Sequence, residues 1–107
     1  MSGRKSKNRG KSFELAVAKF MGMKRAHFEA HDLEGHDLIT VECKKREKLP
    51  KSVKDWYAQA ANAAQCGKVP VLVMGELGQR TKDALVVLAL DDFRAILELT
   101  EDTNYPA

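Results

Sequence analysis

Apolar residues near the N-terminus recur with the spacing of an α-helix. From residue 13 onward they follow the pattern i, i+4, i+7 and i+8, at Phe13, Val17, Phe20 and Met21. That pattern places them on one face of a helix, which Ser12 can cap at its start and Gly22 is expected to end. Glu14 borders the apolar face, so its carboxylate is expected beside the core.

Two stretches after this helix predict a β-hairpin. Residues 26–33 alternate weakly between apolar and polar, and residues 34–37 have the composition of a turn. Residues 38–45 begin with aliphatic and β-branched side chains, which predicts a buried strand. Because successive side chains of a strand point to opposite faces, Glu42 and Lys44 are expected on one face and the residue between them on the other.

The second half of the chain predicts a helix, two strands and a last helix. The first of these helices is expected to end near residue 66, and its apolar face would consist of Val53, Trp56, Ala60, Ala63 and Ala64. Strands are expected over 69–74 and 84–90, and the second is apolar throughout, which favours a central strand. Asp91 or Asp92 can cap the last helix.

The predicted order is therefore α-β-β-α-β-β-α. A helix between two strands makes a crossover, which favours some parallel pairing. We expect an α/β sandwich with a small mixed sheet over residues 12–99. Residues 1–11 are rich in basic residues and contain no acidic one, which predicts a flexible arm, and residues 100–107 predict a frayed tail.

The composition is typical of one soluble domain. The chain has 107 residues, of which 44% are hydrophobic and 31% charged. No apolar run approaches the roughly 18 residues that span a bilayer, so we expect no membrane partner and a cytoplasmic protein. Cys43 and Cys66 lack the spacing of metal ligands, which fits reduced thiols in such a compartment.

Positive charge is concentrated in the first half of the chain. Residues 1–48 hold 12 Lys and Arg against 7 Asp and Glu, whereas residues 49–107 hold 6 against 8. A local basic surplus favours a polyanion partner, although it could also serve solubility alone. The residues expected to contact nucleic acid are Arg4, Lys5, Lys7, Arg9, Lys11, Lys45 and Arg46.

Three carboxylates and one lysine could converge at one edge of the predicted sheet. They come from the first helix and the hairpin: Glu14, Asp32, Glu42 and Lys44. Clustered carboxylates repel one another unless a cation lies between them, and an oxygen-rich site suits Mg²⁺ or Mn²⁺. Such a metal could activate water for attack on a phosphate. Taken alone, Glu42 and Lys44 are explained more simply by an ion pair at a sheet end.

With Gln59 on the following helix, this ordered set resembles the PD-(D/E)XK nuclease superfamily, and most closely its small phage-type and Holliday-junction-resolvase-like members. The resemblance covers about residues 9–98, and it is carried by Arg9-Gly10, Glu14, Asp32, Glu42-Cys43-Lys44, Gln59-Ala60 and the apolar stretches 69–73 and 85–93. It implies a restriction-endonuclease-like fold and a Mg²⁺- or Mn²⁺-dependent DNA endonuclease. The products would carry 5′-phosphate and 3′-hydroxyl ends. The resemblance also implies a homodimer, a preference for branched DNA, and, for a phage protein, the host cytoplasm.

The resemblance also assigns roles to individual residues. Asp32, Glu42 and the backbone carbonyl of Cys43 would bind the metal, and Glu14 would bind it directly or through water. Lys44 would assist the nucleophile, and Gln59 would orient the site.

Two residues are candidates for the metal-binding Asp, because the Pro that usually precedes it in this superfamily is absent. Asp37 lies five positions before Glu42, and an odd separation on one strand places two residues on opposite faces. Asp32 lies ten positions before Glu42, which leaves room for a turn and places it on the neighbouring strand. We favour Asp32, and Asp37 is the alternative because a bulge could restore its facing.

Two other functions compete with a nuclease. One is a nucleic-acid-binding module that keeps the fold without catalysis, and the other is a structural or interaction protein with a surface cluster of ion pairs. Metal-dependent DNA cleavage separates the nuclease from both, and DNA binding without metal separates the other two from each other.

Overall fold

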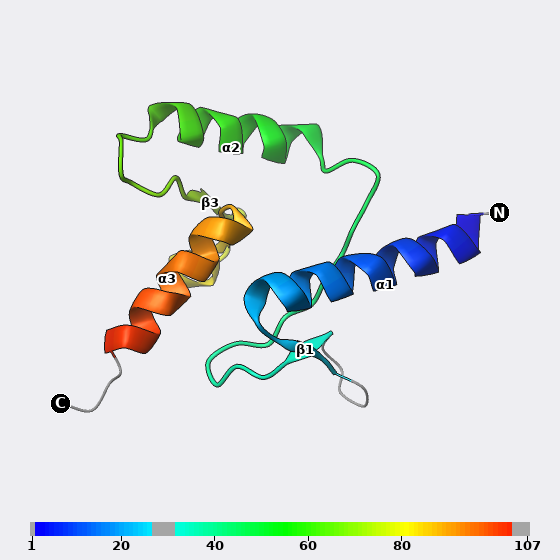
Figure 1. Ribbon diagram of the computed structural model, residues 1–107. Helices are drawn as coiled ribbons and strands as arrows, with labels where there is room; N and C mark the ends of the chain where they lie inside the picture. Colours follow the sequence, from blue (N-terminus) through cyan, green and yellow to red (C-terminus); the bar gives the residue numbers. More distant parts are fainter. Residues whose placement is uncertain (1, 27–31, 104–107) are drawn as a thin grey trace. The chain divides into compact units, whose positions relative to one another are not determined.

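The structure is a computed structural model that describes residues 2–26 and 32–103 (Figure 1). Within these residues it is mixed α/β, with three α-helices and two antiparallel sheets of two strands each. The chain forms two compact units, Met1–Glu47 and Lys48–Ala107, and each is described by itself. No helix in the described ranges is both long and apolar enough to cross a membrane.

Helix α1 spans Ser2–Met21 and begins well before the predicted start at residue 13. Residues 2–11 of the predicted arm are therefore helical, and the flexibility of the arm stays a prediction. The reason for the helix is intrinsic propensity, because Lys and Arg are good helix formers and the segment contains no Pro. Ser12 consequently lies inside the helix and does not cap it.

Gly22 ends α1, as predicted. Its φ of 70° is left-handed, and glycine adopts this conformation without a Cβ clash. The Met23 N–H donates to the Ala18 carbonyl at 2.8 Å, and the Gly22 N–H donates to the Lys19 carbonyl at 3.4 Å. This pair of bonds is a Schellman motif. Met23 and Ala18 are both buried, which supplies the hydrophobic contact that accompanies the motif.

The sheet of the first unit is smaller than the predicted hairpin and shifted along the chain. Strand β1, Lys24–Arg25, pairs antiparallel with β2, Leu33–Glu34. Most of the predicted strand over 26–33 lies outside the described residues. Of the predicted strand over 38–45, only Val41 pairs, through one antiparallel bridge to Leu33. Leu33 fixes this register because it is completely buried, with 0% exposure.

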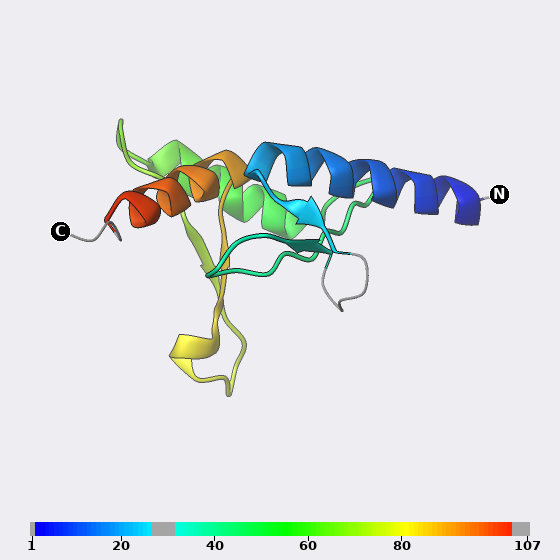
Figure 2. The ribbon, with the colours of Figure 1, turned by 60° about the horizontal axis from the view of Figure 1, so that its bottom comes forward.

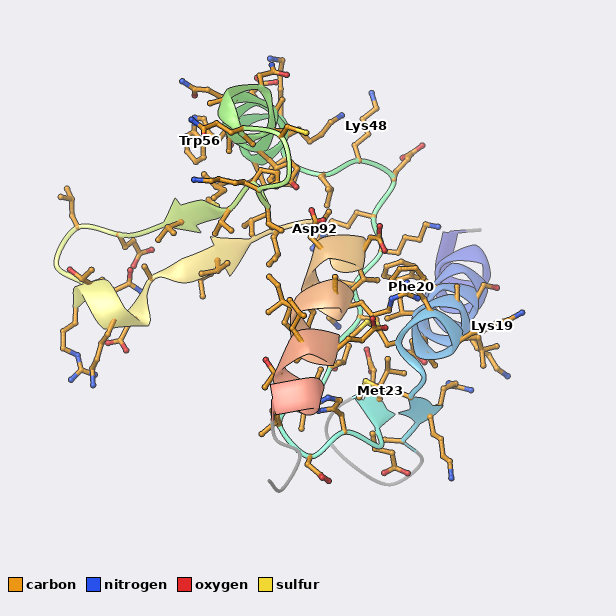
Figure 3. All side chains as sticks on the ribbon, turned by 60° about the vertical axis from the view of Figure 1, so that its left-hand side comes forward. Lys19, Phe20, Met23, Lys48, Trp56 and Asp92 are labelled. Atoms are coloured by element: carbon orange, nitrogen blue, oxygen red, sulfur yellow. The ribbon has the colours of Figure 1, made fainter. Side chains whose placement is uncertain are left out.

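One hydrophobic core joins α1 to this sheet, which lies alongside the C-terminal part of the helix (Figure 1). Its buried members are Val17, Ala18, Met23 and Leu33, and the partly buried residues packed against them are Phe13, Met21, Ile39, Val41 and Cys43. The predicted helical face is confirmed at Phe13, Val17 and Met21. Phe20, labelled in Figure 3, is 37% exposed and lies at the margin of that face.

The second unit contains the remaining elements. Helix α2, Lys51–Ala63, packs on β3, Leu72–Met74. Strand β3 pairs antiparallel with β4, Leu85–Val87, and the 3₁₀ turn η1, Thr81–Asp83, lies between them. Figure 2 shows the two strands extending away from α2 toward η1. Helix α3 follows over Leu90–Thr103, so residues 100–103 of the predicted tail are helical.

The predicted central strand over 84–90 is wrong in extent and environment. It shortens to β4, its only described partner is β3, and the pairing is antiparallel. Val73 and Val86, which oppose each other in the register, are 61% and 57% exposed. The apolar run therefore predicted a strand correctly, but this strand is not buried on both faces. The single mixed sheet of the prediction is not formed among the described residues, which contain two separate sheets.

The predicted apolar face of helix α2 is confirmed at Val53 and Ala60, which are half-buried, but not at Trp56. Trp56, labelled in Figure 3, is 48% exposed, whereas Val53 and Tyr57 are half-buried. Val53 and Tyr57 are four positions apart and therefore neighbours on the helix surface. They line an apolar groove together with Val87 of β4. The large Trp56 side chain was expected to face the core. The next residue, Tyr57, is half-buried in its stead.

Candidate functional site

A polar pocket of about 420 Å³ opens in the first unit, at the join between α1 and the small sheet. It is lined by Gly10, Lys11, Glu14, Arg25, Asp32, Cys43, Lys44 and Lys45. Helix α1 contributes the first three residues, β1 contributes Arg25, and the segments around the Leu33–Val41 bridge contribute the rest. Four of the predicted catalytic and metal-binding residues, Glu14, Asp32, Cys43 and Lys44, thus meet in one pocket with two of the predicted nucleic-acid contacts, Lys11 and Lys45.

Asp32 holds the two segments of the pocket wall together. Its side-chain Oδ2 accepts a hydrogen bond from the Cys43 N–H at 2.6 Å. Its own N–H donates to the Val41 carbonyl at 2.9 Å, and its carbonyl accepts from the Ala26 N–H at 2.9 Å. A bond to an ionised carboxylate is stronger than a neutral one, with a net value of about 1.5–3 kcal/mol. Asp32 therefore has a structural role whatever its chemistry.

Glu14 forms an ion pair across the pocket. Its Oε2 accepts from the Arg25 Nε at 3.1 Å, which joins α1 to β1. The side chains are 22% and 33% exposed, so the pair is less screened by salt than a surface pair. Glu14 was expected beside the core from its helical position, and the structure confirms that place. The guanidinium that neutralises it was not expected.

Cys43 lines the pocket with Asp32 and Glu14. Burial raises the pKa of its thiol, and the negative charges of Asp32, Glu14 and Glu42 raise that pKa further. The thiol remains protonated near neutral pH and is a poor nucleophile and metal ligand in that form.

Glu42 and Lys44 lie farther out. The Lys44 Nζ is 3.5 Å from the Glu42 Oε2, and these side chains are 79% and 51% exposed. An ion pair between such exposed groups contributes about 0–1 kcal/mol. Lys44 lines the pocket with Cys43, although alternation predicted that Cys43 would face the other way. Strict alternation does not hold because residues 42–46 belong to no described strand.

The Lys45 ammonium group lies over an aromatic ring of α1. Its Nζ lies 5.3 Å from the centroid of Phe13, within the range of a cation–π contact. With Lys11, Arg25 and Lys44 it brings the cations of the pocket to four, against the two carboxylates of Glu14 and Asp32. The pocket as a whole therefore attracts an anion.

Three of the predicted site residues, Glu42, Asp37 and Gln59, do not line the pocket. Asp37 is exposed on the segment after β2. The geometry thus separates the two candidate aspartates, because Asp32 lies in the pocket with Glu14 and Asp37 does not. Gln59 is exposed on α2 in the second unit, and its role in orienting the site stays a prediction.

The chemistry of the pocket suits a hard cation in part. Carboxylate oxygens are the ligands that Mg²⁺ and Mn²⁺ prefer. Within residues 2–26 and 32–103, however, no three His, Cys, Asp or Glu side chains are grouped so that they could hold a metal ion. Glu14 binds Arg25, and Glu42 contacts Lys44. Metal binding would therefore require at least one of these carboxylates to exchange its cationic partner for the ion.

Sequence reasoning missed Arg25 and the contact of Lys45 with Phe13. Arg25 follows Lys24 directly, and no spacing distinguishes the two before the register of β1 is known. Lys45 was expected only as one charge of a basic surplus. Comparison with protein-family models, with curated proteins and with solved structures gave no match to this chain.

Proposed function

We propose that this protein is a metal-dependent DNA endonuclease that hydrolyses phosphodiester bonds. The observation that carries the proposal is the pocket of the first unit. Glu14, Asp32 and Lys44 come from three separate segments of the chain and line it together. Their order along the chain and their residue types are those of the PD-(D/E)XK pattern, which supports a hydrolytic site of that kind.

In this proposal Mg²⁺ or Mn²⁺ supplies the Lewis acid that lowers the pKa of water and neutralises a phosphate. Asp32, Glu42 and the Cys43 carbonyl would hold the metal, and Glu14 would hold it directly or through water, which requires Glu14 to leave its ion pair with Arg25. The Lys44 ammonium orients the attacking water and offsets charge that develops on the phosphate. Lys11 and Lys45 hold the DNA backbone at the rim of the pocket.

The fold that belongs to this proposal is the restriction-endonuclease-like sandwich with a small mixed sheet. The mixed α/β content of the described residues, with three α-helices and two antiparallel sheets of two strands each, supports it. Gln59 on α2 would complete the site in that fold. The proposal also includes a homodimer that acts on two DNA strands in the cytoplasm, with a preference for branched DNA such as a Holliday junction.

A nucleic-acid-binding module without catalysis is the second candidate. It is favoured by the excess of cations in the pocket, where Lys11, Arg25, Lys44 and Lys45 face only Glu14 and Asp32. Such an excess attracts phosphate whether or not a metal is bound.

Cleavage of a panel of DNA substrates tests the proposal. Supercoiled plasmid, linear duplex, flapped duplex and a four-way junction are incubated with the protein in Mg²⁺, in Mn²⁺ and in EDTA. The proposal expects nicked or cut products with either metal, none with EDTA, and the fastest rate on the branched substrates. Retarded migration of DNA in EDTA without cleavage in either metal would support the binding module and refute the nuclease.

A further inference from the structure

Arg25 differs from the other cations of the pocket in burial and in the donors it offers. Its side chain is 33% exposed, whereas the three lysines that line the pocket are exposed. The bond to Glu14 is made by Nε, which is one of the five N–H donors of a guanidinium. Further donors are therefore available to an anion while Arg25 keeps Glu14 in place. A planar guanidinium binds phosphate oxygens in pairs, whereas an ammonium acts as a point charge.

The pocket carries more positive than negative charge, and the excess persists when its surroundings are counted. Four cations line it against the two carboxylates of Glu14 and Asp32. Glu42 contacts Lys44 from outside the pocket, and with it the count becomes four against three. Because each negative charge of a ligand is attracted by this excess, a ligand with two charges gains more from the pocket than a ligand with one.

The cations reach the pocket from three separate segments of the chain. Lys11 comes from α1, Arg25 from β1, and Lys44 and Lys45 from the segment after the Val41 bridge. Donors that converge in this way suit a group with many free oxygens. An internal phosphate of a nucleic-acid strand has two free oxygens and one charge. A terminal phosphate monoester has three acceptor oxygens and a charge of about −1.5 to −2 at pH 7.

We propose that the pocket binds the terminal phosphate monoester of a nucleic-acid strand, with Arg25 as the residue that recognises it. The inference deepens the proposed function and rests on it for the nucleic acid, because hydrolysis that leaves a 5′-phosphate turns a singly charged diester into this doubly charged group. The binding needs no metal. A product strand is held by its new end, and strands that already carry a terminal phosphate compete with the substrate.

Three versions of one DNA strand test the ligand. The strand carries a 5′-phosphate, a 3′-phosphate or hydroxyl groups at both ends, with fluorescein on an internal base, and binding is measured by anisotropy in EDTA at one salt concentration. We expect a terminal phosphate to tighten binding about tenfold, since hydrogen bonds to a charged group are the strong ones. Equal binding of all three strands would overturn the inference. Inorganic phosphate that binds as tightly as the phosphorylated strand would also overturn it, because the pocket would then take the free ion.

Two variants of equal charge test the role of Arg25. Arg25→Gln removes the guanidinium from the pocket. Arg80→Gln is the matched control, because Arg80 also forms an ion pair through its Nε, with Asp83 at 2.9 Å, and lies in the second unit. Arg25→Gln should lose most of the preference for a terminal phosphate, and Arg80→Gln should keep it. Loss in both variants, or in neither, would contradict recognition by Arg25.

Lys45→Gln tests the pocket without disturbing the Glu14 ion pair. Circular dichroism checks the folding of each variant, and Lys45→Gln is expected to fold because Lys45 is exposed and lies over the Phe13 ring without an ion pair of its own among the described residues. It should lower the preference for a terminal phosphate severalfold, whereas Lys48→Gln, outside the pocket, should not. An unchanged preference in Lys45→Gln would place the phosphate elsewhere and overturn the inference, even where Arg25→Gln does not fold.

The same measurements separate this inference from the proposed function. If the parent prefers a terminal phosphate through Arg25 but cleaves nothing in Mg²⁺ or Mn²⁺, the inference stands and the nuclease fails. If the parent cleaves DNA and binds the three strands equally, the nuclease stands and the inference fails. A parent protein that neither binds nor cleaves DNA refutes both.

Discussion

Asp32 is the residue on which the pocket most depends, because its carboxylate and its backbone both join neighbouring segments. Asp32→Asn replaces an anionic acceptor with a neutral one at the 2.6 Å bond to the Cys43 N–H. We expect it to lower the free energy of unfolding by about 1 kcal/mol, and to lower the metal-dependent cleavage rate by orders of magnitude.

Asp37→Asn is the matched control, because Asp37 is exposed and does not line the pocket. Its free energy of unfolding should change by less than about 0.5 kcal/mol, and its cleavage rate should stay near that of the parent. Urea unfolding and initial cleavage rates measure both quantities. Loss of cleavage in Asp37→Asn but not in Asp32→Asn would contradict the assignment of the aspartate.

Cys43 reports on the carboxylates around it. Burial and the charges of Asp32, Glu14 and Glu42 raise the pKa of its thiol, so a thiolate forms only at high pH. Alkylation by iodoacetamide at pH 8 should therefore be slower at Cys43 than at the exposed Cys66. Mass spectrometry of tryptic peptides measures the two rates.

The raised pKa of the Cys43 thiol also makes the stability of the fold depend on pH. Because the folded protein holds the Cys43 proton more tightly than the unfolded chain, this thiol stabilises the fold fully below its ordinary pKa. The contribution decreases as pH rises through the ordinary value toward the raised one. Asp32→Asn removes one of the causes and should speed alkylation at Cys43; an unchanged rate would show that Asp32 does not act on the thiol.

At the scale of elements, the C-terminal end of α1 depends on a single glycine. Gly22 has a φ of 70°, and a Cβ added there would meet no atom within 4 Å. Gly22→Ala therefore tests conformation without a steric clash. We expect a loss of about 1–2 kcal/mol in the free energy of unfolding, which is the cost of the left-handed conformation for an L-residue with a side chain.

Gly10→Ala is the control for this prediction. Gly10 lies inside α1, and a Cβ there would also meet nothing within 4 Å. Alanine is the better helix former by about 0.5–1 kcal/mol, so this variant should be more stable than the parent. Chemical unfolding compares the two variants. A Gly22→Ala protein as stable as Gly10→Ala would contradict the Schellman motif.

Helices were more predictable than strands in this chain, for a physical reason. The face of α1 and its stop at Gly22 follow from local spacing and from one residue's freedom of φ. The start of α1 at Ser2 does not follow from the sequence, because a polar basic segment is compatible with both a helix and a disordered arm. The strand expected over 38–45 reduces to Val41 because pairing depends on partners distant in sequence.

At the scale of the whole molecule, the sequence predicted which residues line the pocket better than it predicted the ion pairs that they form. Glu14, Asp32 and Lys44 were expected together, and the described structure brings them to one cavity. Arg25 was not expected, since a counter-ion on β1 leaves no periodic pattern. It makes Glu14 part of an ion pair, so the pocket is more cationic than the set of carboxylates suggested.

The most direct test of the nuclease is the cleavage of a four-way junction by Glu42→Gln and Lys44→Ala in Mg²⁺. Lys48→Ala is the matched control, because Lys48 is an exposed lysine outside the pocket. The Glu42 and Lys44 side chains are 51% and 79% exposed, so folding should be retained in both variants, and DNA binding should be retained in Glu42→Gln. We expect both to lose cleavage while Lys48→Ala cleaves like the parent. Cleavage by Glu42→Gln and Lys44→Ala at the parent's rate would contradict the proposed active site.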